Sequence, residues 1–229
     1  MTGAAPVASQ RKLVSTIAWR TRSQTAYALE GGVFVAGAIV QWLRDGLGII
    51  DSADQTEGLA RETAGNDGVY FVPAFVGLGA PHWQPDARGM ITGLTRGTTR
   101  AHIARAALEA MAYATADVLR AMEQDAGVTA EALAVDGGAS ANNWLLQFQS
   151  DIVQLPVRRP RIIETTALGA AGLAGIAAGV WSGMDEFMAS REDPETFEPR
   201  ATAAERDALV RGWRKAIDAA LHWAAADAS

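Results

Sequence analysis

Two adjacent glycines, Gly137 and Gly138, lie between a short apolar segment and a helix-like segment, and they are the residues best suited to meet a ligand. Glycine permits positive φ and, because it has no Cβ atom, lets a ligand approach the main chain closely. The first N–H groups of a helix lack intrahelical acceptors, and the helix dipole adds positive potential there. An anionic or hydrogen-bonding ligand would suit this place, and Asn142 could offer it a side-chain amide.

A purely structural role for the same residues is the alternative. Gly-Gly turns between a strand and a helix are common, and asparagine is among the preferred residues at a helix N-cap. On spacing alone, the structural role is favoured, with Asn142 capping the helix that follows.

A second candidate site lies in the segment 31–42. Its periodicity predicts a helix over 33–47 with Gly37 inside it, although glycine costs about 1 kcal/mol relative to alanine in a helix interior. Gln41 follows one turn later and would share the face of Gly37. A flat ring could rest on Gly37 while Gln41 hydrogen-bonds to it. Helix packing at Gly37 with a surface Gln41 is the alternative, and the sequence alone favours it.

The remaining motifs point to structure rather than to chemistry. Close packing is predicted for a stripe of small residues on one helix, at Gly169, Gly172, Gly175 and Gly179. His82 and Trp83 are expected to fix the Gly/Pro-rich loop that contains them. The chain has no Gly-x-x-x-x-Gly-Lys-Ser/Thr loop, no Gly-x-Ser-x-Gly elbow and no His-Glu-x-x-His pattern. The sequence therefore offers no obvious nucleophile or general base.

Composition restricts the class of protein further. The chain has 229 residues, 49% of them hydrophobic and 20% charged, which is ordinary for a globular protein. A net charge of −6 gives no overall basic field for nucleic acid or an anionic membrane. Without cysteine there is no disulfide framework and no thiolate metal site, and the three histidines lack metal-ligand spacing. The start has no signal-peptide pattern, so a cytoplasmic location is expected.

Patterning along the chain predicts an α/β domain. A strand hairpin is expected at 13–19 and 26–30 with a polar turn between them. Near the other end of the chain, the charged, Pro-containing segment 191–199 is predicted to be a linker. The most regular helix should begin at Thr98 or Thr99 and end at Gly127. Further strands are expected at 68–76, 89–95, 133–136 and 155–158, and further helices at 144–153, 166–180, 184–190 and 203–226.

Several segments, taken in order, resemble the C-terminal domain of the bacterial glycerol kinases in the FGGY carbohydrate-kinase family. They include Ala-Gly-Ala-Ile-Val-Gln-Trp at 36–42 and Val-Asp-Gly-Gly-Ala-Ser-Ala-Asn-Asn at 135–143. The similarity extends to 27–44, 73–83, 87–96, 147–151, 166–171 and 212–216. It covers nearly the whole chain and is far more specific than any single glycine motif.

The resemblance implies an actin-like, ribonuclease-H-like ATPase domain over 1–229, with a mixed sheet flanked by helices and a C-terminal helix near 203–226. In this family two domains face each other across a cleft, and the C-terminal one holds adenosine. Position by position, Gly37, Gln41, Gly138 and Asn142 match nucleotide-binding residues. The implied ligands are ATP and ADP, with Mg²⁺ carried by the nucleotide.

Other family features have no counterpart here. The catalytic aspartate, the N-terminal phosphate-binding loop and most glycerol contacts would lie upstream, and Met1-Thr-Gly resembles the end of an otherwise missing first strand. We therefore expect a weakened fold, or pairing with a separate N-terminal half.

The expected function is the nucleotide-binding half of an ATP-dependent glycerol kinase, inactive alone and meeting glycerol only with an N-terminal half. A stand-alone nucleotide-binding module and a degenerate remnant are the alternatives. No nucleic-acid or membrane partner is expected, whereas a homo-oligomer is compatible with the resemblance.

Overall fold

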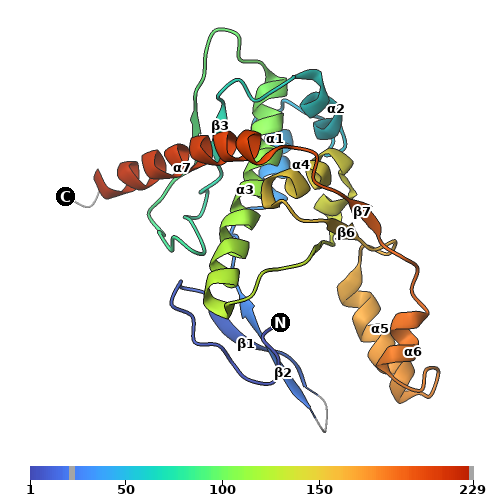
Figure 1. The fold of residues 1–229 in the computed structure, drawn as a ribbon. Coiled ribbons are helices and arrows are strands. Elements are labelled where there is room, and N and C mark those ends of the chain that lie inside the picture. Colours follow the sequence, from blue (N-terminus) through green and yellow to red (C-terminus); the bar gives the residue numbers. More distant parts are fainter. Residues whose placement is uncertain (21–23, 227–229) are drawn as a thin grey trace.

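One long helix, α3 (Arg100–Ala126), runs through the centre of the molecule in this computed structural model (Figure 1). The structure describes residues 1–20 and 24–226. At the start of α3, the Thr99 N–H donates to Nδ1 of His102 over 3.1 Å, and Gly127 ends the helix with φ +66°. His102 Nε2 lies 3.1 Å from Asp67, which fixes the preceding loop to the helix. Both predicted ends of this helix are confirmed.

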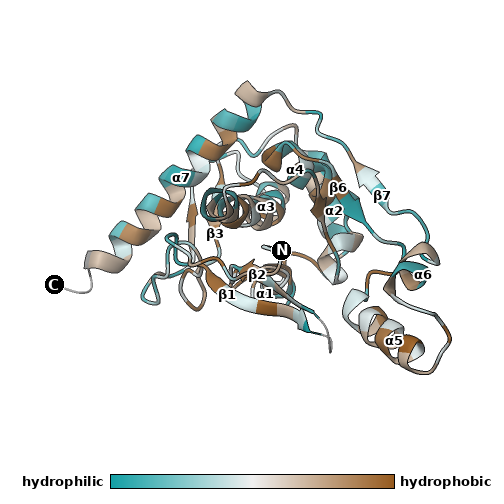
Figure 2. Ribbon diagram, turned by 60° about the horizontal axis from the view of Figure 1, so that its bottom comes forward, coloured by the Kyte–Doolittle hydropathy of each residue, from teal (hydrophilic) through white to brown (hydrophobic). Residues whose placement is uncertain are grey.

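Four helices and a strand pack around α3. They are α1 (Ala38–Asp45), α2 (Gln55–Glu62), α4 (Asn143–Val153), α7 (Ala203–Ala226) and β3 (Tyr70–Val72). Figure 2 shows α3 near the middle of this arrangement. Many of the buried residues of α3 are alanines, whose small side chains let neighbouring elements approach closely. The bounds predicted for α7 are confirmed.

Strands among the described residues form three small sheets. Strand β3 pairs antiparallel with β4 (Met90–Thr92). Strand β6 (Val157–Arg159) pairs parallel with β5 (Leu133–Ala134) and antiparallel with β7 (Glu195–Phe197), so this sheet is mixed. The N-terminal hairpin, which was expected to make the sheet mixed, forms a sheet of its own. The mixed sheet is small, however, and the other strands lie outside it.

Strand β7 corrects the sequence analysis, which took 191–199 as a linker. The segment is extended because it pairs with β6, a contact that is remote in sequence. Arg159 of β6 donates to Glu195 over 2.5 Å, and its guanidinium lies 5.4 Å from the ring centroid of Phe197.

The predicted hairpin is present as β1 (Val14–Arg20) and β2 (Thr25–Glu30), which pair antiparallel. Positions 21–23 of its predicted turn lie outside the described residues. Tyr27 of β2 also bonds to the start of the chain, because its carbonyl accepts the Thr2 N–H over 2.8 Å and its N–H donates to Gly3 over 2.9 Å. Residues 2 and 3 therefore lie beside β2.

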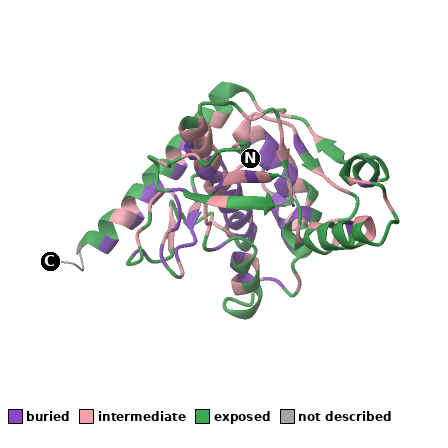
Figure 3. Cartoon of the chain, turned by 90° about the horizontal axis from the view of Figure 1, so that it is seen from below, coloured by how far each residue is buried: buried purple, intermediate pink, exposed green. Residues whose placement is uncertain are grey.

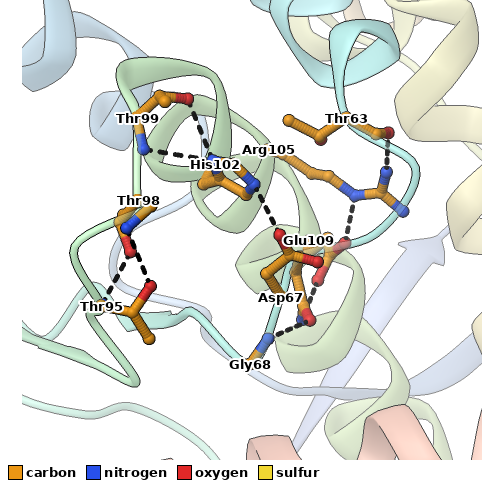
Figure 4. Close-up of polar contacts among 11 residues, drawn as sticks. Thr63, Asp67, Gly68, Thr95, Thr98, Thr99, His102, Arg105 and Glu109 are labelled. Atoms are coloured by element: carbon orange, nitrogen blue, oxygen red, sulfur yellow. Dashed lines mark hydrogen bonds and ion pairs between the residues drawn. The ribbon is translucent and has the colours of Figure 1, made fainter.

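A carboxylate lies inside the core. Glu109 of α3 is 1% exposed and accepts Arg105 Nε over 2.8 Å, Asn66 Nδ2 over 2.9 Å and the Tyr113 hydroxyl over 3.1 Å. Arg105 also donates to the Thr63 carbonyl over 2.6 Å (Figure 4). Burial raises the pKa of Glu109 despite these bonds. The network fixes the loop between α2 and β3 against α3.

Helices α5 (Thr165–Ala177) and α6 (Met184–Ala189) form an arm that projects from the rest of the chain (Figure 1). Figure 3 shows its largely exposed surface. A Cβ atom added at Gly172 would lie 2.5 Å from the Phe187 ring, and one at Gly175 would lie 2.2 Å from Trp181. Close packing is therefore confirmed at these two glycines.

The other two glycines of the stripe do not pack closely. An added Cβ atom at Gly169 or Gly179 would meet nothing within 4 Å, so the packing prediction is wrong there. Apart from Gly172, no described residue of α5 is buried. No helix within the described residues is both long and apolar enough to cross a lipid bilayer.

Candidate functional site

One cavity of about 870 Å³ brings together the two glycine segments that the sequence analysis singled out. Gly37 and Gln41 line it from α1, and Gly138 and Asn142 line it from the other side. We call it the glycine cavity. The start of α2 completes its wall, and α3 contributes Leu108 and Met111. The four residues therefore share one hollow, although they lie about a hundred positions apart in sequence.

Helix α1 begins later than predicted, and this changes the role of Gly37. Gly37 is the N-cap, with φ −54° and ψ −22°, instead of an interior residue. The preceding residues pair with the loop near position 80, because the Ala80 N–H donates to the Gly32 carbonyl over 3.0 Å. The Phe34 ring packs on Trp83 with 5.9 Å between centroids. These tertiary contacts keep 33–37 out of the helix.

The open side of α1 faces the cavity. An added Cβ atom at Gly37 would meet nothing within 4 Å, so its main chain is accessible. Gln41 follows one turn later and is exposed, and its side-chain amide has no hydrogen-bond partner within the described chain. The opposite face of α1 is fixed in the core by Ile39 and Leu43, both fully buried. Gln41 is therefore free to bond to a ligand.

The Gly137-Gly138 turn has the geometry that glycine favours. Gly137 has φ +76°, and its N–H donates to the Ile163 carbonyl over 2.9 Å. Gly138 opens the short 3₁₀ helix η1 (Gly138–Ala141), and its Cβ position is empty within 4 Å. Arg159 supports this turn by donating to the Ser140 carbonyl over 2.7 Å.

Asn142 has the capping role that spacing alone favoured. Its Oδ1 accepts the Leu145 N–H over 2.9 Å at the start of α4, and its Nδ2 donates to the Thr56 hydroxyl over 3.2 Å. The side chain therefore joins α4 to α2. Asn142 also lines the glycine cavity, so a structural role and contact with a ligand are compatible.

The rim of the glycine cavity is acidic. Asp54, Glu57 and Asp136 lie on it. Arg44, the one arginine among the described residues that line the cavity, is held by Asp45 through two bonds of 2.7 and 2.9 Å. A hydrogen bond from Ser52 lowers the pKa of Asp54 below its usual value, so Asp54 is ionised at neutral pH. Such a rim opposes multiply charged anions inside the cavity.

The rim carboxylates are engaged with the protein. Glu57 accepts the Asn143 N–H over 3.0 Å and Arg61 over 2.7 Å, and Asp136 accepts the Thr165 hydroxyl. Within residues 1–20 and 24–226 there is no group of three or more His, Cys, Asp or Glu side chains placed to hold a metal ion.

The floor of the cavity is apolar. It is formed by Leu108 and Met111 of α3 and Leu145 of α4, all buried, so a flat apolar group can be covered there. The contributions of α2, Asp54 and Glu57, had no local signal, because only the fold brings α2 beside α4.

The aromatic loop has the structural role expected of it. Trp83 Nε1 donates to the Lys12 carbonyl over 2.6 Å, which ties this loop to the N-terminal segment. His82 lines a different cavity, between this loop, α3 and α7.

Comparison with known proteins relates this geometry to a family. The profile of the C-terminal domain of the FGGY family of carbohydrate kinases matches residues 1–178. A glycerol kinase from Dechloromonas aromatica is 56% identical over 97% of this chain, and one from Burkholderia pseudomallei is 54% identical over the same share. The chain spans 44% and 45% of the lengths of these relatives.

Solved structures agree in fold. A Plasmodium falciparum glycerol kinase with ADP superposes with a TM-score of 0.87 and 34% identity, over 96% of this chain and 44% of that one. A xylulose kinase from Rhodospirillum rubrum gives a TM-score of 0.75 and 28% identity, over 93% of this chain and 43% of that one. A gluconate kinase from Lactobacillus acidophilus, at 22% identity and a TM-score of 0.78, shows the fold alone. The predicted fold class is confirmed.

Proposed function

The chain belongs to the FGGY family of carbohydrate kinases, and from this premise we propose that it is the nucleotide-binding half of an ATP-dependent glycerol kinase. The complete reaction would convert ATP and glycerol to ADP and glycerol 3-phosphate. The observation that carries the proposal is the shared cavity of Gly37, Gln41, Gly138 and Asn142. The ADP named with the similar Plasmodium kinase supports a nucleotide as the ligand.

The adenine ring would lie on the apolar floor between the two glycine segments. Leu108, Met111 and Leu145 would cover it, while the bare main chain at Gly37 and Gly138 lets the ring approach. The free amide of Gln41 would hydrogen-bond to the adenosine moiety.

The phosphates would point out of the glycine cavity. Its acidic rim repels them, and Arg44 on that rim is already neutralised by Asp45. We propose that Mg²⁺ arrives on the phosphates. Cationic contacts to the phosphates would then come from outside this cavity.

Catalysis would need a second half. Phosphoryl transfer requires a positioned hydroxyl and a group that accepts its proton, and the family resemblance implies that both belong to an N-terminal half. We propose that this chain alone does not phosphorylate glycerol and that an N-terminal half supplies these groups. The location of the reaction would be the cytoplasm.

The same proposal extends the domain to the end of the chain, beyond the matched residues 1–178. Trp213, Ile217 and Ala220 of α7 belong to the same buried cluster as α3, which supports one folding unit. Association into a homo-oligomer, as in the sequence expectation, stays part of the proposal.

Calorimetric titration with ADP tests the nucleotide site. The unmodified chain should release heat of binding, and Gly138→Asp should weaken the affinity at least tenfold, because it directs a carboxylate into the open Cβ position. Gln41→Ala should weaken it less, since it removes one hydrogen bond. Gly97→Asp is the matched control, because its Cβ position is similarly open and it does not line the cavity.

The outcomes separate the alternatives. ADP binding without glycerol turnover in a coupled assay agrees with the proposal. No binding at millimolar ADP would instead identify a degenerate remnant, and normal turnover by this chain alone would show that the base lies within it.

A further inference from the structure

A second hollow lies on a different part of the molecule. It has a volume of about 400 Å³ and lies between the N-terminal segment 10–12, the loop at His82, α3 and α7. None of its lining residues lines the glycine cavity. We call it the basic cavity.

Four cationic side chains line the basic cavity, although the chain as a whole carries a net charge of −6. They come from three separate segments and are Arg11, Lys12, Arg120 and Arg214. Two carboxylates face them, Asp117 and Asp218. The lining therefore carries two more positive than negative charges.

The carboxylates do not neutralise this cluster. Asp117 accepts the Trp213 indole N–H over 2.7 Å and lies 3.4 Å from Arg120. Within the part of the chain that the structure describes, neither Arg11 nor Arg214 forms a close ion pair, although the Asp125 carboxylate interacts electrostatically with Arg11. Two guanidinium groups with five N–H donors each are thus left to face one cavity.

The segment that carries Arg11 and Lys12 is held in place. The Ser9 hydroxyl and the Arg11 N–H both bond to the Asp125 carboxylate of α3. The Lys12 carbonyl accepts Trp83 Nε1 over 2.6 Å, and its Nζ donates to the His82 carbonyl over 3.4 Å. A site whose main chain is already fixed loses less entropy when a ligand binds.

We propose that the basic cavity binds a small organic or inorganic phosphate with at least two negative charges, separately from the nucleotide. Arg11 and Arg214 would hold the phosphate oxygens from opposite walls, because guanidinium groups bind phosphate through paired N–H donors. Lys12 and Arg120 would supply further positive charge. Burial lowers the pKa of His82, so its imidazole is neutral at pH 7 and provides one N–H donor without added charge.

Calorimetric titration of the full chain with inorganic pyrophosphate, without Mg²⁺, tests this proposal. The double variant Arg11→Gln/Arg214→Gln should lose at least tenfold in affinity, because it removes both guanidinium groups. The matched control is Arg96→Gln/Arg211→Gln, which removes the same charge at two exposed residues that line neither cavity. Circular dichroism checks that each variant is folded, and Lys12→Gln replaces the double variant if that variant is not.

Gly138→Asp distinguishes the two sites. Pyrophosphate affinity should stay within twofold of wild type in this variant, even where ADP binding is lost. Pyrophosphate binding that disappears in Gly138→Asp would assign the ion to the glycine cavity and overturn the proposal. Equal affinities of the double variant and its control, or no binding at millimolar pyrophosphate, would overturn it as well.

Discussion

Helices α3 and α5 are both rich in alanine, yet their surroundings are opposite. Helix α3 is enclosed by other elements along most of its length, whereas α5 has a single buried residue among those described, Gly172. Leu108 on α3 is 1% exposed and Leu173 on α5 is 58% exposed. Alanine favours helix formation in both places, but only the enclosed helix supports the core and a binding cavity.

Removal of the cation that pairs with a buried carboxylate should give the largest contrast in stability between the core and the arm. Arg105→Ala leaves Glu109 buried without its ion-pair partner, which should lower the free energy of unfolding by about 3 kcal/mol. Arg161→Ala breaks the pair with Glu192 at the base of the arm, where both side chains are 72% exposed, and should cost less than about 1 kcal/mol. Urea unfolding followed by circular dichroism measures both, and equal costs would contradict the contrast.

A smaller effect should appear within the arm itself. Gly172→Ala places a methyl group 2.5 Å from the Phe187 ring and should destabilise the packing of α5 on α6 by about 1–3 kcal/mol. Gly169→Ala on the same helix points into open space and should stabilise α5 by about 0.5–1 kcal/mol.

Hydrogen exchange of the α5 and α6 amides measures this pair of variants. Faster exchange in Gly172→Ala and slower exchange in Gly169→Ala are expected, with α3 unchanged in both. A change in the same direction for both variants would show that the packing at Phe187 does not hold the arm.

The smallest expected effect is that the pKa values of two glutamates, one in the core and one in the arm, shift in opposite directions. Burial raises the pKa of Glu109 in the core, whereas hydrogen bonds from Ser182 lower the pKa of Glu186 in the arm. Glu109 therefore favours the folded state less as pH rises above its unfolded pKa of about 4.5. Glu186 contributes stability above that value, and the contribution is lost as pH falls through its lowered pKa.

Carbon-detected NMR titration of the two carboxyl groups checks these signs. Glu109 should titrate above the usual glutamate value and Glu186 below it. If both glutamates titrated above the usual glutamate pKa, or both below it, the predicted difference in pKa shift between the core and the arm would be wrong. Glu109→Gln and Glu186→Gln assign the two resonances.

Local signals predicted the parts of the fold that local interactions determine. Thr99 and Gly127 end α3 as expected, and Asn142 caps α4. The start of α1 and the strand β7 were missed because distant partners determine them, the Gly32 carbonyl bond to Ala80 in one case and pairing with β6 in the other.

The candidate site was predictable to a similar degree. The sequence singled out both glycine segments because glycine is unusual inside a predicted helix and at the end of a predicted strand. The family resemblance then assigned both segments to one nucleotide site. The acidic rim was not visible, because Asp54 and Glu57 look like ordinary surface residues until α2 packs beside α4.

The guanidinium of one residue, Arg159, connects the core of the molecule to the strand that follows the arm of α5 and α6. Arg159 bonds to the Ser140 carbonyl beside the Gly138 turn and to Glu195 on the strand that leads out of the arm. Displacement of β7 would therefore act through Arg159 on the Ser140 peptide, which is two residues from Gly138 in the site proposed for the nucleotide.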